Sequence, residues 1–482
     1  MTQGTRNPKT MATERYAWLF YVAVFGIFWV LVSPYILGER MFMDGLYYAT
    51  ISRNLAHGLG SFWNPHFTLT LFPAFHEHPP LAFGLESLFF RVLGDSIYVE
   101  KLYSLLTLAV LSGVVVSLWQ TISRQRHYGW MPLLLLISVP VVGWGVCNNM
   151  LENTLTIFTA ASVLFFFKGE SASRWVYFFV AGVMLSLGFL TKGFVAFFPL
   201  SLPFIYWMMM RNKSFGKMTA ETAIMVAAAV VPLGVLCAVF PVAKESLWQY
   251  FQQQVVKSVM TLATVDSRYY ILGQVFLESL PMLLLAAIVL GISRLKGVIK
   301  EIGRSQIRLS MVFLLLGMTG VVPIMISMKQ SGFYIIATFP MFALGLSVLL
   351  YPVVHHFFLK IHFTSKVLRW FRSMVFAILI IGIGLSLYLS NHYTRDYEQI
   401  QDSKMILKEI PENSTINICN ELYKNWGVRA YFARMKNVSL DDNMNHKHDF
   451  FLIKTAACFD TLAGDYVRVD LKTTKFKLYR RN

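Results

Sequence analysis

The feature that most constrains this chain is a series of long apolar runs. Eleven runs of roughly 17 to 25 residues recur between Tyr16 and about Ser390, and each can cross ~30 Å of hydrocarbon as a helix. Apolar and aromatic residues form 56% of the 482 residues and charged residues 14%, which excludes an ordinary soluble protein. The sequence predicts a polytopic α-helical membrane protein. The predicted spans are 16–37, 98–119, 131–147, 152–168, 175–190, 193–210, 219–240, 271–292, 309–327, 332–354 and 374–390.

Positive charge is unevenly shared between the two sets of loops. The N-terminal tail and the loops on its side carry nineteen Lys and Arg residues, and the opposite set carries eight before the C-terminal tail. Because short cytoplasmic loops hold the excess of positive charge, the N-terminus is predicted to be cytoplasmic and the C-terminal tail external. The first span is predicted to be an uncleaved anchor, because no small-residue cleavage site follows it. Topology then explains most of the net charge of +17, and no nucleic-acid partner is predicted.

The C-terminal tail, 391–482, is predicted to form a small soluble α/β domain. Apolar and polar residues alternate in "STINICN", "RAYFARMKNVSL", "DFFLIKTAA" and "YVRVDLKTTKFKLY", a pattern typical of short strands around a small core. Cys419 and Cys458 share this domain, and a disulfide or two free thiols are equally compatible with their positions. Cys147 and Cys237 lie in or near predicted helices and are predicted to be packing residues.

The first external loop, about 38–97, is predicted to be folded. After Asp44, apolar residues recur every fourth position from Tyr47 to Leu55, which predicts a short helix along the membrane surface. A second surface helix is expected to start at Pro79 and Pro80 and to run through "LAFGLESLFFRVLG". The two helices would present polar side chains at the outer face of the membrane.

Polar groups from other loops are predicted to gather at the same face. A bland interpretation exists for each of them, since surface charges are usually solvated, but ionisable groups at the edge of a bilayer are costly unless they are paired or functional. Carboxylates and cations on one membrane face suit chemistry on a lipid-borne phosphate. The residues are Asp44, Arg53, Glu77, His78, Glu152, Asn153, Lys192, Lys329 and Tyr334, with Lys257, Arg268, Tyr269 and Tyr270 from the long loop 241–270.

Five motifs resemble those of one known group of proteins. They are "MFMDGLYYATISRNL" with "FHEHPPLAF", "MLENTLTIFTAASVLFFF", "GFLTKGFVAFFPL" and "SMKQSGFYIIATFPMFAL". In this order they resemble the GT-C membrane glycosyltransferases, above all the aminoarabinose transferases of lipid A and the protein O-mannosyltransferases that use dolichyl-phosphate-mannose. The resemblance covers roughly residues 16–350 and implies a GT-C fold with its active site at the outer face.

The resemblance assigns roles to residues of this sequence. It implies that Asp44 and Glu152 are the catalytic carboxylates, with Asp44 as general base or acceptor-orienting group. Glu77 and His78 match a Glu-Lys pair at the donor phosphate and metal site. Lys192 and Lys329 fall on positions associated with the donor phosphate, and Arg53 and Tyr334 complete the predicted phosphate-binding set.

Three departures from the family pattern leave the metal requirement open. Many members have Asp-Glu where this chain has Asp44 and Gly45, His78 stands in place of Lys, and the loop 241–270 holds no histidine. A divalent cation bound by Glu77 and His78 would need a third protein ligand, with Glu152 and Asp44 as candidates. The alternative is that Glu77 caps the following helix and that the histidines hydrogen-bond to headgroups or backbone.

The function implied is transfer of a sugar from a polyprenyl (undecaprenyl) phosphate donor to lipid A, another glycan or a protein. The expected location is the bacterial inner membrane, with the active site and the C-terminal domain in the periplasm. No Rossmann-type glycine fingerprint appears, so a nucleotide-sugar site is not predicted. The alternatives are a lipid-linked glycan flippase or transporter, a surface-polysaccharide polymerase or ligase, and a non-catalytic glycan-binding scaffold.

Overall fold

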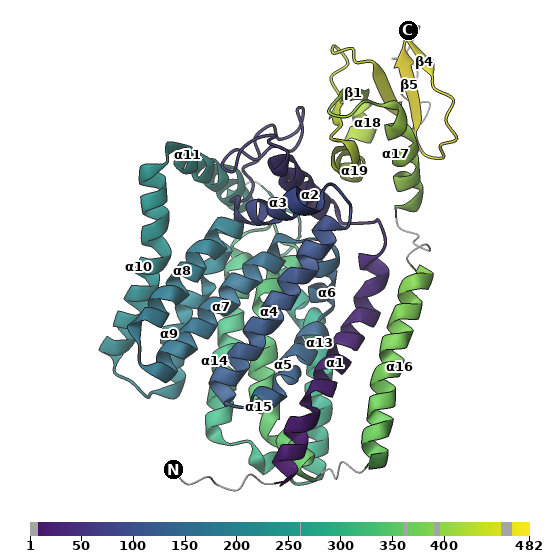
Figure 1. Ribbon diagram of the computed structural model, residues 1–482. Coiled ribbons are helices and arrows are strands. Elements are labelled where there is room, and N and C mark those ends of the chain that lie inside the picture. Colours follow the sequence, from purple (N-terminus) through teal and green to yellow (C-terminus); the bar gives the residue numbers. More distant parts are fainter. Residues whose placement is uncertain (1–7, 261, 361–364, 390–395, 455–464) are drawn as a thin grey trace. The chain divides into compact units, whose positions relative to one another are not determined.

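The chain forms two compact units in the computed structural model, which describes residues 8–260, 262–360, 365–389, 396–454 and 465–482 (Figure 1). The predicted boundary near residue 390 lies close to the start of the last segment of the second unit, but this unit also takes in the first external loop. The first unit contains Met1–Pro34, Leu105–Val146 and Glu152–Leu387, and the second contains Tyr35–Ser104, Cys147–Leu151 and Tyr388–Asn482.

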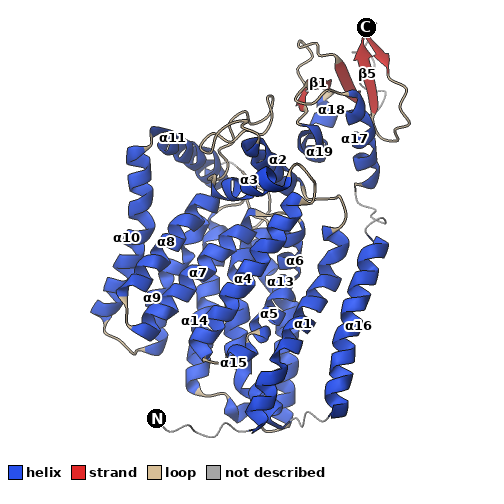
Figure 2. Ribbon diagram, in the orientation of Figure 1, coloured by secondary structure: helices blue, strands red, loops and turns tan. Residues whose placement is uncertain are grey.

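The first unit is built from helices (Figure 2). Its long helices are α1 (Pro8–Ile36), α4 (Val99–Ser123), α7 (Leu151–Ala172), α8 (Trp175–Lys192), α10 (Phe215–Val239), α13 (Tyr270–Leu295), α14 (Arg304–Val321), α15 (Phe339–Lys360) and α16 (Ser365–Leu389), some of whose ends belong to the second unit. Shorter elements are η1 (Arg126–Tyr128), α5 (Trp130–Ile137), α6 (Pro140–Cys147), η2 (Gly193–Ser201), α9 (Leu202–Met210), α11 (Pro241–Tyr250), η3 (Phe251–Val256), α12 (Lys257–Met260), η4 (Ile299–Glu301), η5 (Val322–Ile326) and η6 (Gly332–Thr338).

Among the described residues, nine helices are long and apolar enough to cross a membrane, or ten if the bent pair Arg126–Ile137 and Pro140–Cys147 is one span. The sequence predicts eleven spans. The difference from ten arises at Trp175–Met210, which is counted as one helix here and is predicted from the sequence as the two spans 175–190 and 193–210. The rings of Phe189 and Phe197 stack 5.4 Å apart, whereas eight residues of a continuous helix would rise about 12 Å. The chain therefore turns back at Gly193, whose φ is +77°, and both predicted spans are present there.

The bent pair shows how a backbone N–H group at a helix break finds a hydrogen-bond acceptor inside the first unit. α5 and α6 meet at 81°, at Pro140, which begins α6 and has no N–H to donate. The backbone N–H of Val141 donates to the carboxylate of Glu278 on α13 at 2.7 Å. Because an unsatisfied amide is costly within a bilayer, this side chain compensates for the break.

Burial of the spans differs widely across the first unit. The span Gly332–Lys360, which contains η6 and α15, has 83% of its most apolar stretch buried, whereas the spans of α10, α13 and α16 have 17% each. On α13 the side chains of Phe276, Leu284 and Ile288 are exposed. Such apolar surface is stable only against lipid, so the chain is a multi-pass membrane protein.

The first external loop contains the two predicted helices, α2 (Met43–Ala56) and α3 (Leu81–Leu93). α3 has one buried face and exposes Leu88 and Val92, as expected for a helix at a membrane surface. α2 is buried by protein from Gly45 to Leu55, and its predicted position along the membrane surface stays a prediction. The burial of α2 is tertiary, because it packs against both α3 and α19 (Trp426–Lys436).

The C-terminal tail forms the predicted α/β domain around a five-stranded sheet of order β2-β1-β3-β5-β4. β1 pairs in parallel with β2 and β3, and β5 pairs antiparallel with β3 and β4. The register sets Ile416 opposite Leu440 and Ile418 opposite Leu452. The further elements here are α17 (Tyr397–Glu409), β1 (Thr415–Ile418), α18 (Asn420–Tyr423), β2 (Ser439–Asp441), β3 (Phe450–Ile453), β4 (Tyr466–Arg468) and β5 (Lys477–Arg481).

The strand predicted in "RAYFARMK" is wrong, because this segment is the helix α19. The Asn425 side chain caps its N-terminus by accepting from the backbone N–H groups of Gly427 and Val428. Asn437 ends it in the left-handed conformation, with φ of 51°. These local signals, with the helix-forming Ala430 and Ala433, outweigh the alternating pattern.

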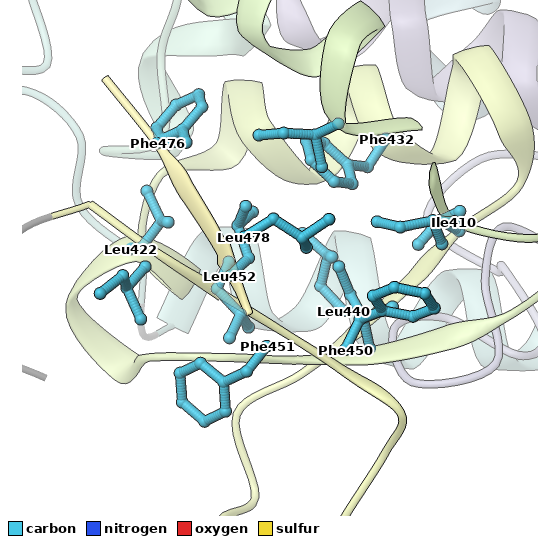
Figure 3. Close-up of a cluster of buried hydrophobic side chains, with 14 of the residues drawn as sticks. Ile410, Leu422, Phe432, Leu440, Phe450, Phe451, Leu452, Phe476 and Leu478 are labelled. Carbon is cyan, nitrogen blue, oxygen red and sulfur yellow. The ribbon is translucent and has the colours of Figure 1, made fainter. Parts of the chain in front are cut away.

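The sheet and its helices enclose one apolar core (Figure 3). Cys419 is buried in this core. Its predicted partner Cys458 lies outside the described residues, so the disulfide stays a prediction. The core includes Ile410, Ile416, Leu422, Phe432, Leu440, Phe450, Phe451, Leu452, Phe476 and Leu478.

Candidate functional site

The N-terminus of α2 places Asp44 in the first helical turn, where the helix dipole favours a carboxylate. The segment Cys147–Leu151 lies against this end of the helix, and the Asn148 side chain accepts a hydrogen bond from the Phe42 backbone N–H at 2.7 Å. A Cβ added to Gly45 would lie 1.9 Å from the Asn148 carbonyl oxygen. This close approach leaves no room for a side chain at position 45 and explains why glycine follows Asp44.

Tyr47, one turn further along α2, lies among charged groups. Its ring stacks on Phe67 with centroids 4.0 Å apart, and its hydroxyl is buried with no hydrogen-bond partner among the described residues. Burial raises the pKa of Tyr47, Arg429 of α19 opposes the rise, and Asp44 and Glu77 add to it. Two predicted site carboxylates and one cation therefore act electrostatically on a single unsatisfied hydroxyl.

His78 lies beside the same helix. Its Nε2 is 3.3 Å from the hydroxyl of Tyr48, and the two rings meet edge to face. The N-cap of α3 is Pro80, which has no side-chain donor or acceptor to cap the helix, and the alternative in which Glu77 caps α3 stays a prediction. Glu77 and His78 are both half-buried.

Glu86 on α3 joins three segments of the second unit. Its carboxyl group accepts from the hydroxyl of Ser52 at 2.8 Å and from the side-chain amide of Asn149 at 2.7 Å. Burial raises the pKa of Glu86 to about 8, although both hydrogen bonds oppose the rise. The sequence pattern does not distinguish this residue, because its position in "LAFGLESLFF" is that of an ordinary helix-surface glutamate.

Arg53 is 3% exposed and is engaged by the C-terminal end of α19. Its guanidinium donates to the carbonyl oxygens of Arg434 at 2.6 Å and Ala433 at 3.1 Å. Burial lowers the pKa of Arg53 to about 10, and Asp95 opposes the fall. The side chain therefore stays charged at neutral pH and holds α19 against α2, while its predicted role at the donor phosphate stays a prediction.

Arg434 makes a second buried link between the tail and the first external loop. It donates to both carboxylate oxygens of Glu100, at 3.0 and 2.9 Å, and to Asp95 at 2.6 Å. Burial alone would lower the pKa of Arg434, but the charges and hydrogen bonds of Glu100 and Asp95 outweigh it and raise the pKa. Bidentate pairs of this kind are among the stronger ion pairs in proteins.

In the first unit, Glu152 and Lys192 form a buried ion pair between α7 and α8. The ammonium group of Lys192 donates to Oε1 of Glu152 and lies 5.0 Å from the ring centre of Tyr334 and 5.6 Å from that of Phe333. Oε2 of Glu152 is buried and finds no hydrogen-bond donor in the part of the chain that the structure describes. Such an orphaned carboxylate oxygen is expected where a ligand or a water binds.

Lys329 lies between η5 and η6, and its ammonium group donates to Oε1 of Gln254 at 3.0 Å. Gln254 belongs to η3, a π-helix (Phe251–Val256), and such interruptions are frequent at functional sites. The loop 241–270 lacks histidine, and its sequence pattern does not distinguish Gln254 from the neighbouring glutamines. The structure thus shows that the side-chain amide of Gln254 is a hydrogen-bond partner of the predicted phosphate-binding residue Lys329.

The eight predicted site residues fall into two sets. Asp44, Arg53, Glu77 and His78 belong to the second unit, and Glu152, Lys192, Lys329 and Tyr334 belong to the first. Within the first unit the structure brings Glu152, Lys192 and Tyr334 together. Within the second unit Asp44 and Glu77 share the surroundings of Tyr47.

Glu77 and His78 do not by themselves fit a divalent cation. Among the described residues, one group of three or more His, Cys, Asp or Glu side chains has metal-ligand spacing, and it contains neither of them. A catalytic ion generally takes three protein ligands, so no step of the chemistry below depends on a metal at this pair.

Arg429, which acts electrostatically on Tyr47, is not among the residues predicted from the sequence. It is 6% exposed, and its guanidinium lies 3.8 Å from the ring centre of Trp426 and 4.5 Å from that of Tyr423. Its Nε has no hydrogen-bond partner among the described residues. The pattern of the segment "RAYFARMK" predicts a strand, and no local sequence pattern indicates that the helix α19 brings Arg429 close to Trp426 and Tyr423.

Sequence comparisons find relatives among lipid-dependent transferases. The family model described as dolichyl-phosphate-mannose-protein mannosyltransferase matches residues 77–237. The undecaprenyl phosphate-alpha-4-amino-4-deoxy-L-arabinose arabinosyl transferase 1 of Proteus mirabilis (strain HI4320) is 21% identical over 244 residues, which cover 50% of this chain and 43% of that protein. The arabinosyl transferase of Pseudomonas savastanoi pv. phaseolicola (strain 1448A / Race 6) is 26% identical over 170 residues, covering 34% and 31%. The matches thus span less than half the length of each relative.

Solved structures match over more of the chain. ArnT from Cupriavidus metallidurans, solved with undecaprenyl phosphate bound, superposes with a TM-score of 0.64 at 13% identity and covers 96% of this chain and 98% of that one. The oligosaccharyltransferase of Archaeoglobus fulgidus in its apo form gives 0.50 at 12% identity, covering 87% and 64%. The predicted fold and the predicted resemblance to the GT-C transferases are therefore confirmed.

Proposed function

We propose that this protein is an integral-membrane glycosyltransferase that moves a sugar from a polyprenyl phosphate, of the undecaprenyl type, to a lipid, glycan or protein acceptor. The proposal extends to its place, with the active site and the C-terminal domain on the periplasmic side of a bacterial inner membrane. The fold shared with ArnT over nearly the whole chain supports it, as do the matches to arabinosyl transferases.

One observation carries the proposal at the level of residues. The Tyr47 hydroxyl is buried without a hydrogen-bond partner among the described residues, and Asp44, Glu77 and Arg429 act on it electrostatically. A folded protein seldom leaves such a group unsatisfied unless a ligand or water completes it. Carboxylates suit hydroxyl groups of a sugar or acceptor, and a cation suits a phosphate.

The reaction requires one proton acceptor and one stabiliser of negative charge. The acceptor hydroxyl oxygen forms a bond to the anomeric carbon, the bond from that carbon to the phosphate oxygen breaks, and the lipid phosphate leaves with the bonding electrons. In our proposal Asp44 takes the proton of the acceptor hydroxyl. Asp44 lies in the first turn of α2, where the helix dipole interacts favourably with a carboxylate.

The leaving phosphate needs cations in a dry site. We assign this role to Lys192 and Lys329, whose ammonium groups each have three donors, of which the structure shows one used by Glu152 and one by Gln254. Glu152 then orients Lys192, and the rings of Phe333 and Tyr334 exclude water from it. Electrostatic stabilisation of this kind is usually the largest single contribution to catalysis.

The test uses the full-length protein in lipid nanodiscs with polyprenyl phosphate-linked sugars and an acceptor extract. Asp44→Asn should lower the release of lipid phosphate by about 10²-fold or more, the loss expected for a positioned base, while donor binding persists. Asp266→Asn changes an exposed acid of another external loop and should leave the rate unchanged. Release at the wild-type rate by a folded Asp44→Asn protein would refute the assignment.

A further inference from the structure

The geometry points to a zinc-type metal site in the C-terminal domain, formed by Asp441, His446 and His448. This site is separate from the transferase chemistry proposed above. Nδ1 of His446 lies 2.7 Å and Nε2 of His448 lies 3.0 Å from the same oxygen, Oδ2 of Asp441. One ligand atom from each of the three side chains lies within 4.8 Å of the others.

The spacing of these atoms suits a small cation with short bonds. Bonds of 2.0–2.2 Å to nitrogen and oxygen in a tetrahedral site put neighbouring ligand atoms about 3.3 Å apart. The two observed distances are shorter than this by a few tenths of an ångström. An outward turn of the His446 imidazole, whose side chain is 60% exposed, would make room without moving the core.

The loop that carries the histidines is anchored by its backbone. Asn417 on β1 is 1% exposed, and its side chain donates to the carbonyl of His446 at 2.7 Å and accepts from the backbone N–H of His448 at 2.8 Å. The hydroxyl of Tyr466 on β4 donates to the carbonyl of His448 at 2.9 Å. With the backbone held from two strands, both imidazoles are presented to the end of β2.

The carboxylate is held in the same way. The backbone N–H of Asn443 donates to Oδ1 of Asp441 at 3.0 Å, which leaves Oδ2 facing the imidazoles. Oδ2 is thus the ligand atom that Asp441 would offer to a metal, which binds carboxylates in their deprotonated form.

The donor set selects the metal. Two imidazole nitrogens and one carboxylate suit zinc and its transition-metal neighbours, whereas calcium and magnesium take mainly oxygen ligands. Three protein ligands leave a fourth position, which the exposure of His446 allows water to fill. A metal here would tie the end of β2 to the loop before β3.

The site is tested with tag-free, full-length protein in nanodiscs, measured for zinc content and by zinc titration calorimetry. Wild-type protein should bind one more equivalent of zinc than Asp441→Asn, and zinc should raise its unfolding temperature more than that of the variant. Asp442→Asn, which changes the neighbouring acid, should match wild type. Calcium and magnesium should neither bind at this site nor compete with zinc.

Two further variants keep the test decisive. His446→Gln changes a largely exposed side chain, so the domain should fold while its zinc affinity falls at least 10-fold. His78→Gln reports any metal bound beside the proposed active site, and its effect should be independent of Asp441→Asn. Equal zinc content and equal affinity in wild type, Asp441→Asn and His446→Gln would overturn the proposal, whatever the transferase assay shows.

Discussion

The carboxyl group of Glu86 shows how much a single buried residue can hold together. It joins α3 to Ser52 of α2 and to Asn149 of the segment that meets the N-terminus of α2. Ser52 in turn donates to the carbonyl of Tyr48, so a protonated Glu86 can donate to Ser52 without disturbing this bond. The neutral acid is thus the form that the folded structure favours.

This preference predicts a pH dependence of stability. The pKa of Glu86 is raised to about 8 in the folded protein, against about 4.3 in an unfolded chain. The folded state binds more protons between these values, so its stabilisation is complete below about pH 4.3 and is lost as the pH rises through about 8. Glu86→Gln should unfold several degrees above wild type at pH 9 and similarly to wild type near pH 5.

Unfolding scans in nanodiscs across this pH range measure the effect. Glu245→Gln is the control, because Glu245 is exposed on α11 and its carboxylate accepts from Gln249. The difference between Glu86→Gln and wild type should grow with pH, while the control tracks wild type throughout. Parallel curves for all three proteins would contradict the assignment of the neutral form.

At the scale of elements, the start of α2 is defined by contact with a distant segment. The Asn148 side chain caps this end, and the Asn148 carbonyl occupies the space where a Cβ of residue 45 would stand. The helical turn that holds Asp44, the proposed proton acceptor, is therefore positioned by packing as well as by helix propensity. Gly45 has no role that its own neighbours in sequence would indicate.

Gly45→Ala tests this contact. The added Cβ, at 1.9 Å from the Asn148 oxygen, forces the backbone to move, and overpacking of this kind typically costs 1–3 kcal/mol. We expect a lower unfolding temperature and, because Asp44 is displaced, a loss of transferase activity larger than the loss of folded protein. Gly113→Ala in α4 is the control, since a Cβ there meets nothing within 4 Å. A Gly45→Ala protein with wild-type stability and rate would show that the contact is dispensable.

At the scale of the whole molecule, the C-terminal tail and the first external loop belong to one unit. The links are buried charges, with Arg53 on the carbonyls of α19 and Arg434 on Glu100 and Asp95. Deleting 391–482 would leave Arg53 and Glu100 buried without these partners. Such a deletion therefore tests folding before it tests acceptor selection.

Arg434→Met addresses the link directly. Removing one member of a buried ion pair typically costs 3–5 kcal/mol, because the remaining charge stays buried. We expect a large drop in unfolding temperature, partly restored when Glu100→Gln is added. Arg468→Met, at an exposed position on β4, should be neutral. Additive losses in the Arg434→Met and Glu100→Gln double variant would disprove the coupling.

Apolar runs, charge asymmetry and short motifs were enough to predict the membrane spans, the two helices of the first external loop and the strands β1, β3 and β5. These features depend on neighbours within a few residues, so local periodicity reports them. The same local information placed Asp44, Glu77 and His78 in one external loop. It also found the turn at Gly193, where the run of apolar residues is interrupted by Lys192.

Only the tertiary structure decided what several of these residues touch. Arg53 donates a hydrogen bond to the carbonyl of Ala433 on α19, 380 residues further along the chain. The carboxyl group of Glu86 accepts a hydrogen bond from Asn149, and the carboxylate of Asp441 lies within hydrogen-bond distance of two imidazoles. A sequence pattern carries no information on such partners, because each contact depends on how remote segments fold against one another. The free energies of burial and of hydrogen bonding that set these roles exist only after those segments have met.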